Sequence, residues 1–318
     1  MPVAVSKPVV QTIPATADIK EILEILHRDG VIVLSDFCPE EEVDALNAKA
    51  KIHFERCEAE GRAADSFHGS KGRATHTTAA YGLLGSAPEE LCKIMQRKVW
   101  HQVMEEFLTH ESWDWGGDEK VYRKTGYWLH TNIGYKVSPG ANNQRLHRDL
   151  NSAAIQRTGP ESLVNGVSTF VAGCDVTPRN GGTHVAPGSH LWPQDRMPTQ
   201  EDTVAVSMKK GSMAIWLSNI FHGAGANTCE PDEPNAVRTI YGLFCISDNF
   251  RQGESTAWIC EPEVLKKMPP EVLRLLGMYA GRTGGGRFIG REPVQTWGPL
   301  KDYNGGEWIY RGLDSIYQ

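Results

Sequence analysis

Hydrophobic positions divide the chain into a helical first part and a strand-rich second part. The segment ADIKEILEILHRDG has apolar residues at helical spacing from Ile19 to Leu26 and ends at Gly30, a usual helix stop. The run VIVLSDF that follows is short and apolar, which predicts a strand. PEEEVDALNAKAKIHFERCEAEG then opens with proline and acids, the preferred first turn of a second helix.

The texture changes in the second part of the chain. Residues 60–80 are polar and predict a loop, and residues 88–108 again show helical spacing. Between residues 127 and 250 the apolar runs are short and rich in β-branched and aromatic residues, with turn clusters between them. These runs are YWLHTNIGYKV, GVSTFVAGCDV, TVAVSM, SMAIWLSN and RTIYGLFCI. They predict a β-sandwich or open barrel with helices in front of it.

No internal repeat, low-complexity tract or linker interrupts the pattern, so we expect one domain over residues 1–318. A helical part at about 15–118 would precede a barrel core at about 120–250 and a C-terminal arm or lid at about 251–318. The last segment, 280–318, has no clear periodicity. It would suit a lid, an arm around the barrel, or a contact in a homodimer.

The composition limits the kinds of partner that we expect for the chain. The 318 residues are 40% hydrophobic and 23% charged, as in ordinary globular proteins. The net charge of -6 and the lack of a Lys/Arg run argue against nucleic acid. Seven scattered cysteines with no C-x-x-C pair argue against disulfides and thiolate zinc sites, which favours a reducing, cytoplasmic compartment. No apolar run is long enough for a signal peptide or a membrane span, so we expect no membrane partner.

The stretch QRLHRDLNS holds the first candidate chemistry. In a strand, His147 and Asp149 would point to the same face while Arg148 faces away. His222 follows a later apolar strand and makes a second imidazole available. Two histidines and a carboxylate form the facial triad of non-haem Fe(II) oxygenases. A pattern as short as His-x-Asp also arises by chance, and a surface pair is the alternative.

Arg238 begins the strand RTIYGLFCI, shortly after His222. Iron of this kind commonly takes electrons from 2-oxoglutarate, whose far carboxylate needs a cationic partner inside the barrel. Arginine stays charged and binds a carboxylate with two parallel hydrogen bonds. A lone arginine at a strand start is usually a rim residue, but after His-x-Asp and a distal histidine it becomes the expected anchor.

The ordered set HRD, NGGTHVAPGSH, GSMAIWLSNIFHGAGANT and a strand opening in arginine resembles the phytanoyl-CoA dioxygenase family of Fe(II)/2-oxoglutarate-dependent oxygenases. The likeness covers roughly residues 19–250, including the opening GVIVLSDFCPEEEVDAL. It implies a mainly β fold with helices: a double-stranded β-helix, or jelly-roll barrel, flanked by N-terminal helices. It also implies that His147, Asp149 and His222 bind Fe(II), with 2-oxoglutarate and O2 as co-substrates.

Within that family, the chain is most similar to the fungal branch that oxidises terpenoid, meroterpenoid and alkaloid intermediates of secondary metabolism. The resemblance implies that Gln144 and Thr183 contact 2-oxoglutarate beside Arg238, and that the partner is a small hydrophobic organic substrate. The insertion CEPDEPNAV lengthens the loop before Arg238. Because the carboxylate is present as Asp149, the halogenase variant of this chemistry is disfavoured. Relatives are often homodimers.

Other polar residues near these motifs have weaker claims. Where relatives form the pocket mouth, RATHTTAAYGLL supplies His76 and Tyr81 as candidate substrate-wall residues. Ile240 is a third candidate, because it shares the face of Arg238 by strand alternation. His184 and His190 in THVAPGSH are expected to be structural. We interpret the glycines of HGAGAN as room for backbone turns beside the metal.

Three rival functions remain open on sequence alone. An acyl-CoA 2-hydroxylase of the same chemistry would want a basic mouth for the CoA phosphates, which a net acidic chain supports little. A zinc hydrolase could use the same two histidines and aspartate with an open position. It predicts no need for Arg238. A non-catalytic barrel used for binding would make the triad a coincidence.

Overall fold

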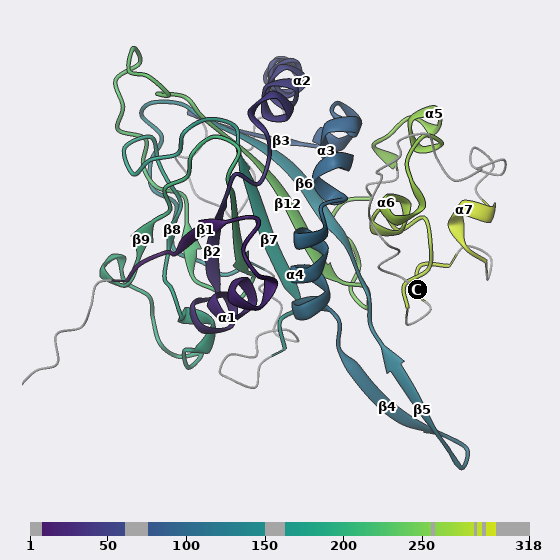
Figure 1. The fold of residues 1–318 in the computed structure, drawn as a ribbon. Helices are drawn as coiled ribbons and strands as arrows, with labels where there is room; N and C mark the ends of the chain where they lie inside the picture. Colours follow the sequence, from purple (N-terminus) through teal and green to yellow (C-terminus); the bar gives the residue numbers. More distant parts are fainter. Residues whose placement is uncertain are drawn as a thin grey trace, which may run out of the picture.

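Two facing sheets form the body of the protein, with helices packed on one outer face (Figure 1). The computed structural model describes residues 8–60, 76–149, 163–255, 258–282, 285–287 and 291–296. The larger sheet has the strand order β1-β2-β10-β7-β12-β6-β3. Its strands are β1 (Thr12–Pro14), β2 (Val31–Ser35), β3 (Thr77–Tyr81), β6 (Tyr127–Val137), β7 (Gly166–Ala172), β10 (Met213–Leu217) and β12 (Arg238–Ser247).

The smaller sheet has the order β11-β8-β9. Its strands are β8 (His184–Val185), β9 (Val204–Ala205) and β11 (His222–Gly223). Isolated bridges between His147 and His222, Val176 and Met208, and Asn180 and Asn227 extend the pairing. Every strand pair except β1–β2 is antiparallel. This is the double-stranded β-helix predicted from the sequence.

Alternate residues of the large sheet face two separate cores. In β2, Ile32 and Leu34 belong to the core shared with the helices, whereas Val31 and Val33 belong to the core between the sheets. Successive side chains of a strand point to opposite faces, so one face carries the helices and the other is free to line an interior. Trp216 of β10 belongs to this inner face and is almost completely buried.

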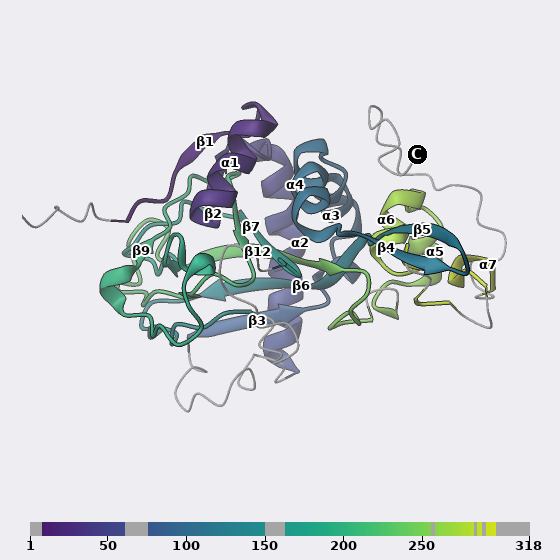
Figure 2. The ribbon, with the colours of Figure 1, turned by 90° about the horizontal axis from the view of Figure 1, so that it is seen from below.

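The N-terminal helices cover the outer face of the large sheet (Figure 2). They are α1 (Ile19–Asp29), α2 (Glu40–Ala59), α3 (Pro88–Met95) and α4 (Lys98–Leu108). The predicted first helix is confirmed: the carboxylate of Asp18 accepts a hydrogen bond from the Lys20 N–H, and Gly30 ends the helix at φ +70°. Single 3-10 turns lie at Leu83–Gly85, Ser189–Leu191 and Gln200–Asp202.

The structure differs from the local predictions at three places. Of the segment 60–80, expected to be loop, residues 61–75 lie outside the described residues, and the residues from Thr77 belong to strand β3, which pairs with β6 from Thr77 opposite Val137. The helix expected over 88–108 is two helices, since Arg97 is extended between them and forms an ion pair with Glu42. The hairpin of β4 (Glu111–Gly116) and β5 (Glu119–Lys124), which projects from the body in Figure 1, was not predicted.

Short helices follow the large sheet: α5 (Pro262–Leu265), α6 (Pro270–Leu275) and α7 (Pro293–Thr296). In both views they gather on the side of the molecule away from β8 and β9 (Figures 1 and 2). Most of the segment 280–318, expected to be a lid, arm or dimer contact, lies outside the described residues. All seven cysteines are free thiols. Across the described part of the chain, no helix is both long and apolar enough to cross a membrane.

Candidate metal centre

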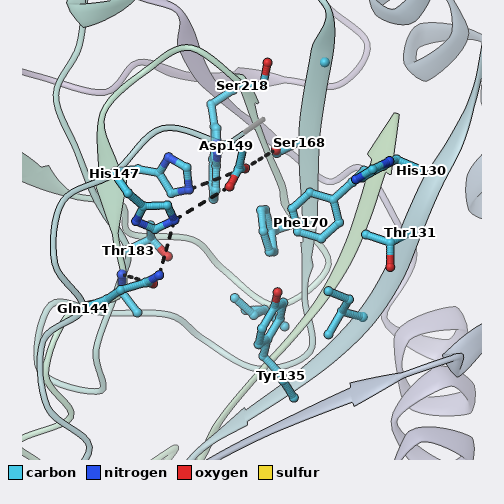
Figure 3. A pocket seen from close by; sticks show the side chains of 18 of the residues that line it. His130, Thr131, Tyr135, Gln144, His147, Asp149, Ser168, Phe170, Thr183 and Ser218 are labelled. Carbon is cyan, nitrogen blue, oxygen red and sulfur yellow. Dashed lines mark hydrogen bonds and ion pairs between the residues drawn. The ribbon is translucent and has the colours of Figure 1, made fainter. Parts of the chain in front are cut away.

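His147, Asp149 and His222 meet at one point in the cavity of the barrel. Figure 3 shows His147 next to Asp149. Their ligand atoms all lie within 4.8 Å of one another. Nε2 of His147 is 3.7 Å from Oδ1 of Asp149, and Nε2 of His222 is 3.6 Å from Oδ2. Among the residues that the structure describes, this is the one group of three or more His, Cys, Asp or Glu side chains close enough to hold a metal ion.

Backbone pairing sets the two imidazoles side by side. His147 and His222 exchange two N–H to C=O hydrogen bonds of 2.9 Å, as an isolated antiparallel bridge. Their ring centroids are 4.5 Å apart. Arg148, between the ligands, faces away as predicted: its guanidinium donates to the Ser189 carbonyl at 2.8 Å and lies over the Phe221 ring. The sequence His-x-Asp therefore presents two ligands to one face.

Each histidine is oriented by a carbonyl. Nδ1 of His147 lies 3.0 Å from the Arg145 carbonyl, and Nδ1 of His222 lies 3.2 Å from the Ile220 carbonyl. A carbonyl can only accept, so the proton is on Nδ1 in both rings and the Nε2 lone pair is left for a metal. The Ser168 hydroxyl of β7 donates to Oδ2 of Asp149 at 2.9 Å. Neutral imidazoles and a carboxylate are the donor set of a facial Fe(II) triad.

Arg238 lines the same cavity and is only 2% exposed. Its Nε and Nη1 are buried without a hydrogen-bond partner, and no ion pair of its guanidinium occurs within the described residues. Burial lowers the pKa of Arg238 to about 10, which still leaves it charged at neutral pH. A buried cation without a counter-ion is costly, so this guanidinium is suited to an anionic ligand.

Gln144 and Thr183, the other two residues expected at the co-substrate, also line the cavity. Oε1 of Gln144 accepts from the Ala224 N–H at 3.1 Å, which directs its amide nitrogen to within 3.3 Å of Nε2 of His147. Thr183 lies in the turn before β8, where Gly182 packs against the backbone of Val206. The structure thus brings both residues next to the triad (Figure 3).

The glycines beside His222 allow two backbones to touch. A Cβ on Gly223 would lie 2.9 Å from the Gln144 carbonyl oxygen, and one on Gly225 would lie 2.5 Å from the Gly182 carbonyl oxygen. Contacts this short are not tolerated by a side chain. The interpretation of HGAGAN as room for the backbone next to the metal therefore agrees with the structure.

The cavity has a volume of about 370 Å³. Of the candidate substrate residues, Tyr81 and Ile240 line it. His76 is exposed and is not among the lining residues. Most of the remaining wall is apolar or aromatic: Ala79, Ile133, Tyr135, Val137, Val167, Phe170, Trp216, Phe244 and Ile246. Trp216 stacks on Phe170 at 4.4 Å between ring centroids, which makes a rigid wall beside His222.

His184 and His190 lie outside the cavity lining, as expected for structural residues. His190 is buried, and its Nε2 donates to the His27 carbonyl at 3.1 Å. His184 bonds the Thr203 hydroxyl at 3.1 Å. Burial lowers the pKa of both imidazoles, which keeps them neutral.

Sequence reasoning missed Ser168 and His130, which both line the cavity. Ser168 sits in a run of seven buried residues, where a hydroxyl is a signal because buried polar groups need a partner. His130 interrupts the alternation of apolar and polar residues in YWLHTNIGYKV, but the pattern does not indicate toward which face of the strand the imidazole points.

Comparison with known proteins identifies the family to which the chain is similar. The family model of phytanoyl-CoA dioxygenase matches residues 26–231. A dioxygenase, swnH1, of Arthroderma benhamiae is 30% identical over 89% of this chain and 90% of that protein. The multifunctional dioxygenase prhA of Penicillium brasilianum is 28% identical over 72% of this chain and 74% of that protein.

The fold has a solved counterpart in the non-heme alpha-ketoglutarate-dependent carbocyclase SnoK from nogalamycin biosynthesis. That structure superposes on this one with a TM-score of 0.52 and 17% sequence identity, over 74% of this chain and 86% of the SnoK chain. The family model and these relatives define an oxygenase, and its fold is a jelly roll. The chain belongs to the phytanoyl-CoA dioxygenase family.

Proposed function

We propose that the protein is an Fe(II)- and 2-oxoglutarate-dependent dioxygenase that oxidises a C–H bond of a small, largely apolar organic molecule. Its family membership supports an oxygenase. The single observation that carries the co-substrate is Arg238, a buried guanidinium without a counter-ion on the wall of the cavity that holds the triad.

His147, Asp149 and His222 would hold the iron, since each presents a ligand atom to the same point. Two imidazoles and one carboxylate on one face leave the other positions open for ligands. When bound, iron and 2-oxoglutarate supply an oxidant from O2 with release of carbon dioxide and succinate. The remaining chemistry is left to the chain itself: it must bind, orient and shield the reactants.

Arg238 would pair with the carboxylate of 2-oxoglutarate farthest from the iron. It begins β12, opposite Val137 of β6, and lines the cavity that holds the triad. Thr183 and Gln144, beside the triad, supply a hydroxyl and an amide to the same cavity.

The apolar wall favours a hydrophobic substrate. The Phe170 ring contacts the rings of Phe244 and Trp216, and the Trp216 ring lies 5.2 Å from that of His222. Such a wall holds a substrate C–H in a fixed place relative to the metal ligands. We infer a small natural product, such as a terpenoid or alkaloid intermediate of fungal secondary metabolism, as the substrate class. Hydroxylation, desaturation, epoxidation and rearrangement are all compatible outcomes.

Two rivals have less support. An acyl-CoA substrate would bring phosphates to the cavity, but none of the described residues that line it is a lysine, and Arg148 is already bonded to Ser189. A zinc hydrolase would use the triad but would leave the buried charge of Arg238 without a purpose.

An anaerobic optical titration tests the proposal. Metal-free protein receives Fe(II) and 2-oxoglutarate, singly and together. A weak visible charge-transfer band is expected only when both are present. Asp149→Ala should lose the band, and Arg238→Ala should require at least tenfold more 2-oxoglutarate, because a charged hydrogen bond is removed.

The matched control is Arg179→Ala, which removes an exposed arginine paired with Glu233 and should behave as the unaltered protein. Bound iron with no band in the unaltered protein would contradict the dioxygenase assignment and favour a hydrolase or a binding barrel. An unchanged 2-oxoglutarate requirement in Arg238→Ala would remove this residue from the co-substrate site.

A further inference from the structure

A β-bulge interrupts the pairing of β6 with β12 beside the cavity. Thr131 lies opposite Phe244, and Leu129 lies opposite Cys245, the very next residue of β12. His130 is therefore the extra residue of the bulge. In an unbroken strand His130 and Thr131 would point to opposite faces, yet both line the cavity. The bulge re-aims the imidazole toward the interior, a use that bulges often have next to functional sites.

The segment Gly253–Glu254 holds this bulge in one conformation. The Gly253 N–H donates to Nδ1 of His130 at 2.9 Å, and the Glu254 N–H donates to the His130 carbonyl at 2.9 Å. The carboxylate of Glu254 accepts from the Asn132 N–H at 3.0 Å and from the Thr131 hydroxyl. Four hydrogen bonds thus fix the backbone and the ring of His130.

These contacts also determine where the proton of the ring lies. A backbone N–H can only donate, so Nδ1 of His130 must be an acceptor and the proton must be on Nε2. The ring is then neutral. Burial lowers the pKa of His130, which also favours the neutral ring. Nε2 has no hydrogen-bond partner among the residues that the structure describes. His130 therefore offers one N–H donor to the cavity.

The donor lies far from the end that Arg238 occupies. Arg238 and Phe244 are six residues apart on β12, which corresponds to about 20 Å of strand. Figure 3 shows His130 and Thr131 across the cavity from Gln144 and Thr183. A molecule bound against His130 would therefore leave the Arg238 end free for a second ligand.

We propose that His130 is a substrate-binding residue whose Nε2–H donates a hydrogen bond to a neutral oxygen of the substrate, a carbonyl, ether or hydroxyl oxygen on an otherwise apolar molecule. The inference rests on the proposed function only in taking this cavity as the place of the substrate. The walls around the donor are apolar, with Ile133, Phe170 and Phe244 among them. A protonated amine would present a donor to a donor, and the neutral ring offers a carboxylate no charge.

Ring nitrogen NMR of the metal-free, full-length protein tests the donor directly. The probes are 2-decalone, the hydrocarbon decalin and protonated 2-decalylamine, which share one bicyclic body. The ring signals of His130 are assigned by their loss in His130→Gln. We expect an unprotonated Nδ1, a protonated Nε2, and a shift of the Nε2 signal with the ketone but not with the other two probes.

Binding of the same probes to variants separates recognition from structure. His130→Leu should lower the preference for ketone over hydrocarbon by roughly three- to tenfold, the value of one net hydrogen bond. His130→Gln keeps an N–H at the distal position and should retain most of the preference. Gly253→Ala keeps the imidazole but should lose the preference, because its Cβ would lie 2.7 Å from Cε1 of the ring and displace it.

His76→Leu is the matched control, since His76 is exposed and does not line the cavity. A protonated Nδ1, ring signals unmoved by the ketone up to its solubility, or an equal loss in the Leu and Gln variants would each overturn the proposal. These measurements use metal-free protein. Failure of the iron-dependent reaction would appear in the optical titration and leave them unchanged.

Discussion

The hydroxyl of Ser168 donates a hydrogen bond to Oδ2 of Asp149 across 2.9 Å, and the same oxygen lies 3.6 Å from Nε2 of His222. Ser168 is buried in β7, so this hydroxyl positions the only anionic member of the triad from a rigid strand. Hydrogen-bond partners of metal ligands of this kind commonly account for ten- to hundredfold in metal affinity.

Ser168→Ala should therefore weaken metal binding by about tenfold while the fold is kept. The reason is that Asp149 loses the donor that fixes its carboxylate. Competition with a coloured chelator, with Fe(II) under nitrogen or with Co(II), measures the affinity. Ser112→Ala, on the exposed strand β4, is the control and should bind metal normally. Equal affinity of the two variants would show that Ser168 does not position the ligand.

Replacement of Gln144 should weaken the binding of 2-oxoglutarate without weakening the binding of the metal. Its amide nitrogen is 3.3 Å from Nε2 of His147, the atom that would bind the metal. Gln144→Ala removes this competing contact, so metal affinity should stay equal or rise by up to about fivefold, the value of one net hydrogen bond. Affinity for 2-oxoglutarate should fall by a similar factor. Calorimetric titration of metal and then 2-oxoglutarate measures both, and a parallel loss of the two would count against this role.

Local pattern was enough to predict the two longest strands of the large sheet and the shared face of His147 and Asp149. YWLHTNIGYKV forms β6 and RTIYGLFCI forms almost all of β12. Both were predictable because runs of β-branched and aromatic residues bounded by turns favour strands. The alternation of His147, Arg148 and Asp149 likewise follows from strand geometry. The resemblance to a family supplied what spacing could not, namely the expectation that Gln144 and Thr183 contact a co-substrate.

Features that depend on partner strands could not be predicted. The strand Thr77–Tyr81 is weak by composition and exists because β6 accepts it as a neighbour. The inward face of His130 is set by a bulge, which is a mismatch between two strands and not a property of one. That Arg238 has no counter-ion among the described residues depends on all the side chains around it and not on its position in the sequence. Sequence order alone contains none of these.

The backbone contact between the two glycine turns should be sensitive to a single methyl group. Gly225→Ala would bring a Cβ to 2.5 Å from the Gly182 carbonyl oxygen, a rigid backbone atom. Overpacking of this kind typically costs about 1–3 kcal/mol of unfolding free energy. Urea unfolding measures the loss. Gly285→Ala is the control, because a Cβ there has no neighbour within 4 Å, and an equal loss in both variants would contradict the contact.

His101 should make the protein less stable in acid. The side chain is fully buried in α4, and its Nδ1 lies 2.8 Å from the Tyr127 hydroxyl. Burial lowers the pKa of His101 from 6.5 to about 4. The folded pKa is below the unfolded one, so the unfolded chain binds more protons between these values. The stability that this histidine contributes is present above pH 6.5 and lost as the pH falls to about 4.

The size of the effect follows from the pKa difference and is about 3 kcal/mol. His101→Asn keeps a polar group near the Tyr127 hydroxyl but cannot titrate. Its unfolding free energy should start lower at pH 7 and fall less between pH 6.5 and 4 than that of the unaltered protein. Urea unfolding at several pH values measures the two slopes, with His76→Leu as an exposed control that keeps the full slope. Identical slopes in His101→Asn and the unaltered protein would mean that the acid sensitivity arises from other groups.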